Sequence, residues 1–429
     1  MTGQFPTREA IASHQLAQLR RLLAAILPAN SFYRNKLAGL DPAIASLEDF
    51  QARFPFTTKQ ELVEDQLRQP PFGTNLTFPA ERYTRFHQTS GTTSRAPLRW
   101  LDTPESWNGM VESWREILRV AGVRAGDRLY FAFTFGPFIG FWLAFDAAQA
   151  MGCLCLPGGG LSSQGRLRAI LDNDVTVLCC TPSYAACLAE VAGRENADLH
   201  AGAVRTIIVA GEPGGSVPAT RQKLESLWPG ARVFDHHGMT ETGPVSHQCP
   251  ALPGTLHVLD SAYLAEVIGA GGKPAQAGDE GELVLTTLGR AASPLLRYRT
   301  GDLVRAGDGA VCACGRHGTV LRGGILGRTD EMVIVRGVNI YPAAVEEVLR
   351  GFPEIAEYQV QVDQSRTLAQ LSLRVEPRAG CGQPEALAGR VGDALHGVFN
   401  LRVPVALAAA GSLPRFEMKA RRWSVVPCN

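Results

Sequence analysis

The chain has 429 residues, 45% of them hydrophobic, and a formal net charge of +1 from 42 Lys and Arg against 41 Asp and Glu. The length exceeds the roughly 250–300 residues that one hydrophobic core supports, so we expect at least two domains. The composition excludes disorder, collagen and coiled coil, and the balanced charge gives no reason to expect nucleic acid or an anionic membrane as a partner.

The N-terminal region predicts a helical start and no targeting segment. Leucines at helical spacing within residues 10–37 predict helix. The first residues lack the basic and apolar regions of a secretory signal, and several of the ten cysteines sit in apolar stretches, so we expect a cytoplasmic protein with reduced thiols. Residues 129–145 are uncharged, but Gly136-Pro137 interrupts them, so a strand, a loop and a helix start explain them better than a membrane span.

The middle of the chain alternates short apolar runs with helical patterns. We expect strands at residues 128–135, 175–180, 206–209 and 232–234. We expect helices at residues 165–172, 183–192 and 218–227. Such alternation predicts an α/β fold with mostly parallel, doubly wound strands. Beyond Asp302 the pattern becomes a compact α+β one, with helices at 342–351 and 384–398 and strands at 358–362 and 369–375. We therefore expect a large N-terminal α/β domain over residues 1–329 and a small C-terminal α+β domain over residues 330–429.

Residues 88–97 read QTSGTTSRAP, a loop rich in hydroxyls that follows a strand-like segment. Backbone N–H groups and hydroxyls in such a loop can bind phosphate oxygens, and Arg95 adds positive charge. The loop lacks the Walker pattern of spaced glycines followed by lysine. A polar hairpin turn is the alternative, and taken alone it is the commoner explanation of such a segment.

Two acidic motifs follow. Residues 235–243 read DHHGMTETG directly after a short strand, where open α/β sheets place ligands, and Glu241 could hold Mg²⁺. Residues 296–302 read LRYRTGD, in which Asp302 could accept both hydroxyls of a ribose. The alternatives are local hydrogen bonding by the histidines and a turn aspartate that caps its own backbone.

Together with GRTDEMVIVRGVNIYP at 327–342 and PRFEMK at 414–419, these motifs resemble the adenylate-forming superfamily, and within it the phenylacetate–CoA ligase-like branch. FYRNK at 32–36, FPFTTK at 54–59, TPSY at 181–184 and GEP at 211–213 are also similar to that branch. The resemblance spans nearly the whole chain. It implies an acid–thiol ligase that uses ATP to convert a small aromatic carboxylic acid to an acyl-adenylate and then transfers the acyl group to coenzyme A.

Two alternatives accompany that function. One is a stand-alone adenylation enzyme that passes the acyl group to a carrier-protein thiol or an amine. The other is a non-catalytic nucleotide-binding protein, which the presence of Lys419, Glu241 and Asp302 disfavours. The oligomeric state is open, with a homodimer as one option.

The resemblance also implies roles for individual residues. Lys419 would reach the carboxylate and α-phosphate, Glu241 would hold Mg²⁺ and Arg328 would lie near the phosphates. Asp330 would be the hinge about which the small domain rotates, and Arg336 with Gly337 would line the coenzyme A tunnel. The residues implied to bind ATP are Ser90, Gly91, Thr92, Thr93, Arg95, Gly211, Glu212, His237, Thr240 and Asp302.

The chain departs from the branch at two places. Ser94-Arg95 replaces the usual Gly-Lys of the phosphate loop, which keeps the charge but loses glycine flexibility. His237 replaces the usual tyrosine before Gly-Met-Thr-Glu, so a ring that can stack remains, but it can titrate. Neither change removes an indispensable charge, so we expect an active enzyme.

The acyl pocket is expected among aromatic residues, which would make it short, flat and apolar. Its candidate residues are Phe135, Phe138, His236, Gly238 and Met239. The alternative, weighed about evenly, is that these aromatics are core. His236 and His237 could also accept a hydrogen bond from a ring amino or hydroxyl substituent.

A separate group of soft ligands, Cys249, His257, Cys312 and Cys314, could form a closed, tetrahedral structural zinc site. Some members of the branch carry a similar arrangement. His247 or His317 are substitute ligands, and the alternative is two unrelated surface loops with reduced cysteines.

Overall fold

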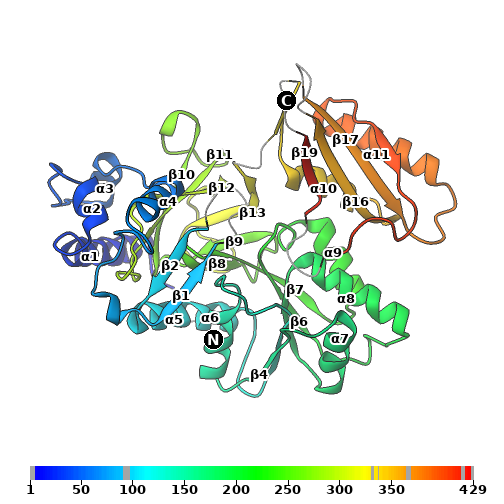
Figure 1. Cartoon of the computed structure of the whole chain (residues 1–429), viewed down its shortest axis with the longest axis horizontal. Helices are drawn as coiled ribbons and strands as arrows, with labels where there is room; N and C mark the ends of the chain where they lie inside the picture. Colours follow the sequence, from blue (N-terminus) through cyan, green and yellow to red (C-terminus); the bar gives the residue numbers. More distant parts are fainter. Residues whose placement is uncertain are drawn as a thin grey trace.

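The computed structural model describes residues 5–89, 97–329, 333–336, 338–363, 369–416 and 421–426. It has a large N-terminal domain rich in sheet and a smaller C-terminal domain (Figure 1). The expected site residues that lie outside the described residues are Ser90, Gly91, Thr92, Thr93, Arg95, Asp330, Gly337 and Lys419.

Most helices of the large domain begin at an N-cap residue whose side chain accepts a hydrogen bond from a backbone N–H group of the first turn. The residue types at these N-cap positions favour this arrangement. They are α1 (Arg8–Ile26), α2 (Ser31–Lys36), α3 (Leu47–Arg53), α4 (Lys59–Arg68), α5 (Pro104–Val120), α6 (Trp142–Ala150), α7 (Ser163–Asp172), α8 (Pro182–Glu195) and α9 (Pro218–Leu227), with short 3₁₀ turns at Ala80–Arg82 and Ala270–Gly272. Residues 10–37, expected to be helical, therefore form two helices. None of the helices in the described ranges combines the length and the apolar character that a bilayer crossing requires.

The large domain is built on one 11-stranded sheet in the order β10-β11-β12-β13-β9-β8-β7-β6-β5-β3-β4, with a separate β1–β2 hairpin. The strands are β1 (Arg85–Gln88), β2 (Arg99–Asp102), β3 (Arg128–Phe131), β4 (Leu154–Pro157), β5 (Val177–Cys180), β6 (Thr206–Val209), β7 (Arg232–Met239), β8 (Gly243–Gln248), β9 (Thr255–Val258), β10 (Tyr263–Ile268), β11 (Glu280–Thr287), β12 (Tyr298–Ala306) and β13 (Val320–Arg328).

Strand β7 is where the sheet changes direction. On one side it pairs with β6 in parallel, and β6, β5, β3 and β4 continue the parallel arrangement that strand–helix alternation predicts. On the other side it pairs with β8 antiparallel, and the strands beyond β8 in the sheet are also antiparallel. The expected strand at 232–234 is longer than its apolar run, because pairing with β8 extends it through the polar residues as far as Met239.

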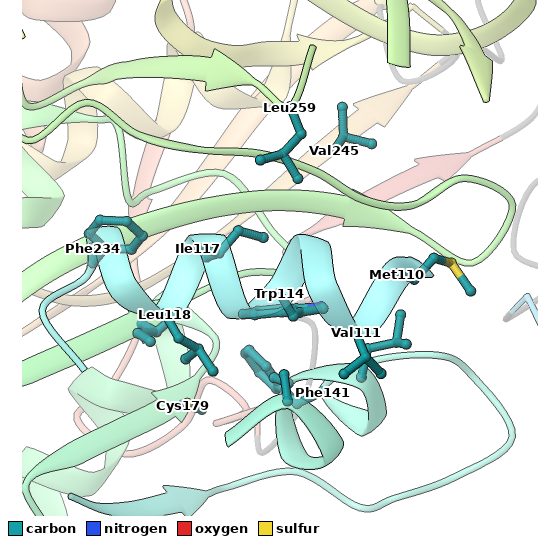
Figure 2. Packing of buried hydrophobic residues seen from close by; sticks show 14 of the residues in the cluster. Met110, Val111, Trp114, Ile117, Leu118, Phe141, Cys179, Phe234, Val245 and Leu259 are labelled. Atoms are coloured by element: carbon teal, nitrogen blue, oxygen red, sulfur yellow. The ribbon is translucent and has the colours of Figure 1, made fainter. Parts of the chain in front are cut away.

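The main core of the large domain surrounds α5, an amphipathic helix that packs against α6 and β8. Trp114 is 2% exposed, and its ring centroid lies 6.1 Å from that of Phe141. Figure 2 shows these two rings facing each other, with Ile117 and Leu118 one turn further along the same helix. The segment at 129–145 is thus a strand, a loop and a helix start buried in this core, as expected.

The small domain is a four-stranded sheet, in the order β18-β17-β16-β19, with two helices and a β14–β15 hairpin. Its elements are β14 (Val333–Val335), β15 (Val338–Ile340), α10 (Pro342–Arg350), β16 (Ile355–Asp363), β17 (Gln370–Pro377), α11 (Pro384–Phe399), β18 (Val405–Leu407) and β19 (Trp423–Val426). Buried aliphatic residues from both helices and the sheet form its own core, which is the mark of an independent domain.

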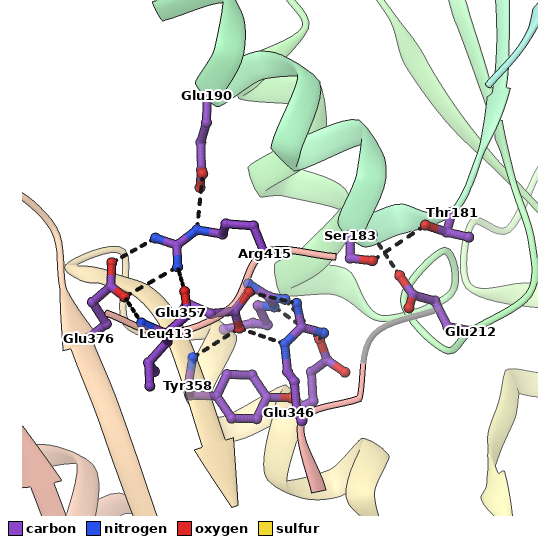
Figure 3. Close-up of polar contacts among 12 residues, drawn as sticks. Thr181, Ser183, Glu190, Glu212, Glu346, Glu357, Tyr358, Glu376, Leu413 and Arg415 are labelled. Atoms are coloured by element: carbon purple, nitrogen blue, oxygen red, sulfur yellow. Dashed lines mark hydrogen bonds and ion pairs between the residues drawn. The ribbon is translucent and has the colours of Figure 1, made fainter. Parts of the chain in front are cut away.

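The two domains meet at a charged contact beside α8 and α9 (Figure 3). Arg415 of the small domain forms a bidentate ion pair with Glu376 of β17, and its Nε lies 3.5 Å from Glu190 Oε2 of α8. Lys223 of α9 is half-buried in the same contact, where desolvation, with a smaller effect of the Arg350 charge, lowers its pKa to about 7. This contact between the domains is therefore rich in charged groups, as interfaces between domains of one chain commonly are.

Candidate active site

A cavity of about 370 Å³ opens beside β7, at the point where the sheet changes direction. Open α/β sheets bind ligands at such positions. The cavity is lined by Lys59, Thr89, Trp114, Ala132, Phe133, Phe138, Ile139, Gly140, Phe141, Leu143, Thr181, Ala210, Gly211, His236, Gly238, Met239, Thr240, Glu241, Gly243, Pro244, Tyr298, Thr300 and Arg328. Most of the lining is apolar, with its charged groups limited to Lys59, Glu241 and Arg328 among the described residues.

Glu241 follows β7 in the turn to β8 and is 4% exposed. Its Oε1 lies 3.1 Å from Nζ of Lys59, and the Tyr298 hydroxyl donates to the same oxygen over 3.4 Å. The carboxylate is thus held at the cavity wall with a lysine beside it. A buried carboxylate oxygen that faces a cavity is a suitable ligand for Mg²⁺.

The backbone of this turn is held in place by Arg290. Its Nη1 donates to the carbonyl oxygens of Thr240 and Glu241 over 3.0 and 2.7 Å. Its Nε and Nη2 form a bidentate ion pair with Asp102 of β2, in which both side chains are almost fully buried. Because Asp102 lies on the hairpin that carries the hydroxyl-rich segment, this pair ties the hairpin to the turn that holds Glu241.

Asp302 lies on β12 and is 4% exposed. Its Oδ2 accepts from Nε2 of His237 over 2.9 Å, and its Oδ1 accepts from Nη1 of Arg328 over 3.0 Å. The structure therefore brings two of the expected ATP-binding residues, His237 and Asp302, into one chain of contacts with the expected catalytic residue Arg328. His237 does not line the cavity and contacts Asp302, which is distant in the sequence, so this contact is not the local hydrogen bonding weighed as the alternative for this histidine.

Gly211 and Glu212 follow β6, and they face different surroundings. Gly211 lines the cavity with a φ of 91°, a conformation that glycine adopts without strain. The Glu212 side chain turns toward α8, where Oε1 accepts from the backbone N–H of Ser183 over 2.7 Å (Figure 3). A carboxylate at a helix N-terminus is stabilised by the unpaired N–H groups there.

The aromatic part of the cavity is formed by Phe133, Phe138, Phe141 and Trp114. Phe138 lies where the sequence predicts an acyl-pocket residue, and so do His236, Gly238 and Met239. Phe135 does not line the cavity: its ring packs 4.0 Å from that of Phe133 and 4.9 Å from that of Trp142, centroid to centroid. The aromatic residues thus divide between cavity wall and core, because the loop turns at Phe135, which has a positive φ of 50°.

Of the residues expected to line the coenzyme A tunnel, only Arg336 is described. It is exposed, and it lies in the turn between β14 and β15 with a φ of 51°. The turn belongs to the small domain, so its distance from the cavity depends on the orientation of that domain.

Sequence reasoning missed several residues of this site. Lys59 appears in the sequence only as the end of a similar motif, yet Thr58 and Glu61 form a capping box that places it at the start of α4. The capping box can be identified in the sequence and predicts the start of the helix, but it does not predict the ion pair between Lys59 and Glu241. Trp114 and Arg290 carry no local signal, because their partners are distant in the sequence.

The soft-ligand cluster comes together as expected. Cys249, His257, Cys312 and Cys314 offer ligand atoms that all lie within 4.8 Å of one another. Sγ of Cys249 lies 3.6 Å from Sγ of Cys312, and Sγ of Cys314 lies 3.3 Å from Nε2 of His257. His247 is outside this group, although its ring centroid is 5.8 Å from that of His257, since its Nδ1 donates to the Gln248 carbonyl.

The chain thus has a buried carboxylate and a lysine at the wall of an apolar cavity, in a large domain that is followed by a smaller one. Residues 86–291 match the AMP-binding enzyme family, and residues 337–424 match the AMP-binding enzyme C-terminal domain. The phenylacetate–coenzyme A ligase of Thermus thermophilus is 35% identical over 93% of this chain and 89% of its own length. That of Pseudomonas putida is 30% identical over 96% of this chain and 93% of its own. The chain belongs to the phenylacetate–CoA ligase family of adenylate-forming enzymes.

Solved structures agree with this membership. 2-Hydroxyisobutyryl-CoA ligase in the postadenylation state, in complex with an acyl-AMP, is 28% identical and superposes with a TM-score of 0.92 over 99% of this chain and 91% of its own. The same enzyme in the thioesterification state, with coenzyme A, gives 0.73 over 98% and 91%. The domain orientation of this chain is therefore similar to the postadenylation one.

Proposed function

We propose that the chain joins a small aromatic carboxylic acid to coenzyme A in two steps that use one cavity. In the first, a carboxylate oxygen attacks the α-phosphorus of ATP, the bond to the β-phosphate breaks, and pyrophosphate leaves. In the second, the thiol sulfur attacks the acyl carbon, AMP leaves, and the thiol proton is released. The observation that carries this proposal is the ion pair between Lys59 and the buried Glu241 at the wall of an apolar cavity in a chain of this family.

The first step brings two anions together, so fixed cations and positioning must supply most of the rate enhancement. Glu241 would hold Mg²⁺, which would neutralise phosphate charge, and Lys59 lies beside its carboxylate. Asp302 binds the ribose, with His237 and Arg328 orienting its two oxygens. The fixed ion pairs around these groups reduce the reorganisation needed when charge develops.

The remaining roles fall on Arg336 and on residues outside the described ranges. Ser90, Thr92, Thr93 and Arg95 bind the phosphates, and Lys419 supplies the charge that favours adenylation. Rotation about Asp330 then withdraws Lys419 and brings Arg336 and Gly337 to the thiol. The resemblance of the motifs supports these roles, and two half-reactions measured separately test them.

The aromatic class of the acid follows from the cavity walls. Phe133, Phe138, Phe141 and Trp114 offer ring faces and edges that pack favourably against another ring. The cavity holds a short acyl group, since these rings close the space that a long alkyl chain would need. Incubation of benzoic and phenylacetic acids with MgATP, followed by measurement of pyrophosphate, tests the class. Failure of both acids, with octanoic acid active, would overturn it.

The acceptor is tested in the same way. The purified chain is incubated with an active acid, MgATP and either coenzyme A or a phosphopantetheinyl carrier protein, and the products are analysed by mass. We expect the coenzyme A thioester. Acyl transfer only to the carrier would replace coenzyme A as the acceptor while leaving the adenylation step intact.

We also propose that Cys249, His257, Cys312 and Cys314 hold a structural zinc ion. Three sulfurs and an imidazole nitrogen converge from the end of β8, from β9 and from the 307–319 loop, which is the donor set of closed tetrahedral zinc sites. Because all four positions come from protein, no position remains for substrate. The ion would fasten the loop to the sheet, and metal analysis of the purified chain tests it.

A further inference from the structure

His236 lies on β7 at the wall of the cavity, between the helix that carries Trp114 and the turn that carries Gly243. Its ring centroid is 4.2 Å from that of Trp114, with an angle of 51° between the ring planes. The side chain is held by packing as well as by hydrogen bonding, and it is 6% exposed. A polar ring therefore stands next to the aromatic part of the cavity wall.

The hydrogen bonds of His236 fix its tautomer. Nδ1 lies 2.8 Å from the carbonyl oxygen of Ser246, and a carbonyl oxygen can only accept, so Nδ1 carries the hydrogen. Burial lowers the pKa of His236 to about 3, so the ring is neutral near pH 7. A neutral imidazole has one hydrogen, which leaves Nε2 as a bare acceptor.

The position of Nε2 places this acceptor at the cavity. A Cβ atom built on Gly238 would lie 3.2 Å from it, and Gly238 and Pro244 both line the cavity. Among the residues that the structure describes, none forms a hydrogen bond with Nε2 of His236. This atom is accessible to solvent, whereas Nδ1 of His237 is fully buried and has no hydrogen-bond partner among these residues. The cavity thus offers one directed acceptor in the part lined by Trp114 and Phe141.

Resting on the function proposed above, we propose that His236 is the residue that determines substrate specificity: the aromatic acid carries a ring hydroxyl or amino group that donates a hydrogen bond to Nε2 of His236. An aromatic acid without such a donor would bury the bare acceptor against carbon, and an unpaired buried acceptor is costly. Sites that bind a substrate hydroxyl or amine through hydrogen bonds reject analogues without it more strongly than apolar sites reject an extra methylene.

The first test uses the unmodified chain and matched pairs of acids. Each hydroxy- or amino-substituted benzoic and phenylacetic acid is compared with its methyl isostere at the same ring position, by pyrophosphate release without coenzyme A. At one ring position we expect the kcat/KM of the donor-bearing acid to be at least about tenfold higher than that of its methyl isostere. A difference of this size corresponds to the free energy of one neutral hydrogen bond. The methoxy analogue, which cannot donate, should show no such advantage.

The second test changes the acceptor. In His236→Phe a ring still packs on Trp114 but accepts no hydrogen bond, so the ratio of kcat/KM between the donor-bearing acid and its methyl isostere should fall to about one. In His236→Gln an amide oxygen can accept, and part of the ratio should return. A merely structural role would lower both acids equally and leave the ratio unchanged. His200→Phe, a change at an exposed histidine, serves as the matched control.

The outcomes separate this inference from the function on which it rests. If aromatic acids are adenylated but no ring position favours a donor, the inference is wrong and the proposed function stands. If no acid of the panel releases pyrophosphate, both are wrong. If the ratio survives in His236→Phe, the donor is recognised elsewhere and His236 is not the residue responsible. Should the phenylalanine variant not fold, the acid panel and His236→Gln decide the question.

Discussion

Nζ of Lys59 lies 3.1 Å from Oε1 of Glu241, across a separation of 182 residues along the chain. Lys59 starts helix α4 and Glu241 follows strand β7, so the pair joins the N-terminal helices to the turn at the end of the central strand. Because the glutamate is nearly buried while the lysine is about one-third exposed, the lysine compensates a charge that would otherwise be costly to bury. The pair places a carboxylate oxygen at the cavity wall, which is the position of the magnesium ligand in the function proposed above.

Glu241→Gln removes the negative charge but keeps the size of the side chain. We expect adenylation to fall by about 100-fold or more, since the loss of one preorganised electrostatic contact to the reacting phosphates has effects of that order. Pyrophosphate release measured over a range of Mg²⁺ concentrations checks this, and the apparent Mg²⁺ affinity should fall as well. Glu81→Gln, at an exposed site, is the control. An unchanged Mg²⁺ dependence would show that Glu241 is not a magnesium ligand.

Lys419→Ala should abolish adenylate formation and leave thioester formation from a supplied acyl-adenylate largely intact, because a mobile ammonium is expected only in the first step. The two half-reactions are followed separately, by pyrophosphate release and by the mass of the coenzyme A thioester. Lys273→Ala changes an exposed lysine and should affect neither. Equal loss of both half-reactions in a folded Lys419→Ala variant would contradict the assigned role.

Cys312→Ser should lower the zinc content and the thermal stability of the chain more than it lowers substrate affinity. A serine hydroxyl replaces a thiolate poorly as a zinc ligand, and structural zinc contributes directly to folding. Metal analysis and thermal denaturation are compared with Cys381→Ser, a cysteine of the small domain outside the cluster. Zinc-free protein with an unchanged melting temperature in the variant would remove the proposed metal site.

Burial of neutral His236 makes the folded state less stable in acid. Its pKa is lowered from 6.5 to about 3, so below pH 6.5 the unfolded state binds the proton first, and stability is lost as the pH falls toward the folded pKa. Between pH 7.5 and pH 5 the loss amounts to about 2 kcal/mol from this residue. Chemical denaturation at both pH values should show a smaller difference for His236→Phe than for the unmodified chain. An equal difference would mean that His236 is not buried as a neutral ring.

The contact between Arg415 and Glu190 belongs to the observed domain orientation. Both side chains are about one-third exposed, so the pair contributes at most about 1 kcal/mol and is screened by salt. Glu190→Gln should therefore slow adenylation by less than about fivefold, and the effect should shrink at high ionic strength. Rates at low and high salt, with Glu385→Gln as an exposed control, check this. A salt-independent loss would point to a structural cause.

Much of the fold could be predicted from local patterns. The strand at Thr206–Val209 and the helix at Pro218–Leu227 lie where an apolar run and a helical pattern predict them, because a short buried strand and a helix each have a local sequence signal. Strand β7 was predicted too short, since its second half is stabilised by pairing with β8 rather than by its own composition. The antiparallel part of the sheet had no comparable signal.

The motifs of the candidate site could be predicted from the sequence, but the contacts between their residues could not. Glu241, Asp302 and Arg328 were identified from the order of short segments, and the structure brings Asp302 and Arg328 to within 3.0 Å of each other. Phe135 and Phe138 carry the same local signal, yet only Phe138 lines the cavity. The difference arises from the course of one loop, which is decided by packing against α6.

By itself the sequence determined the α/β class, the family and the chemical groups available, because hydrophobic periodicity and ordered motifs are local properties of a chain. Only the tertiary structure decided that Lys59 faces Glu241, that Arg290 holds the turn, and that Nε2 of His236 reaches the cavity. These relationships join residues distant in sequence, or depend on the direction of one side chain. They are fixed by close packing and by the need to pair buried polar groups, which no local pattern encodes.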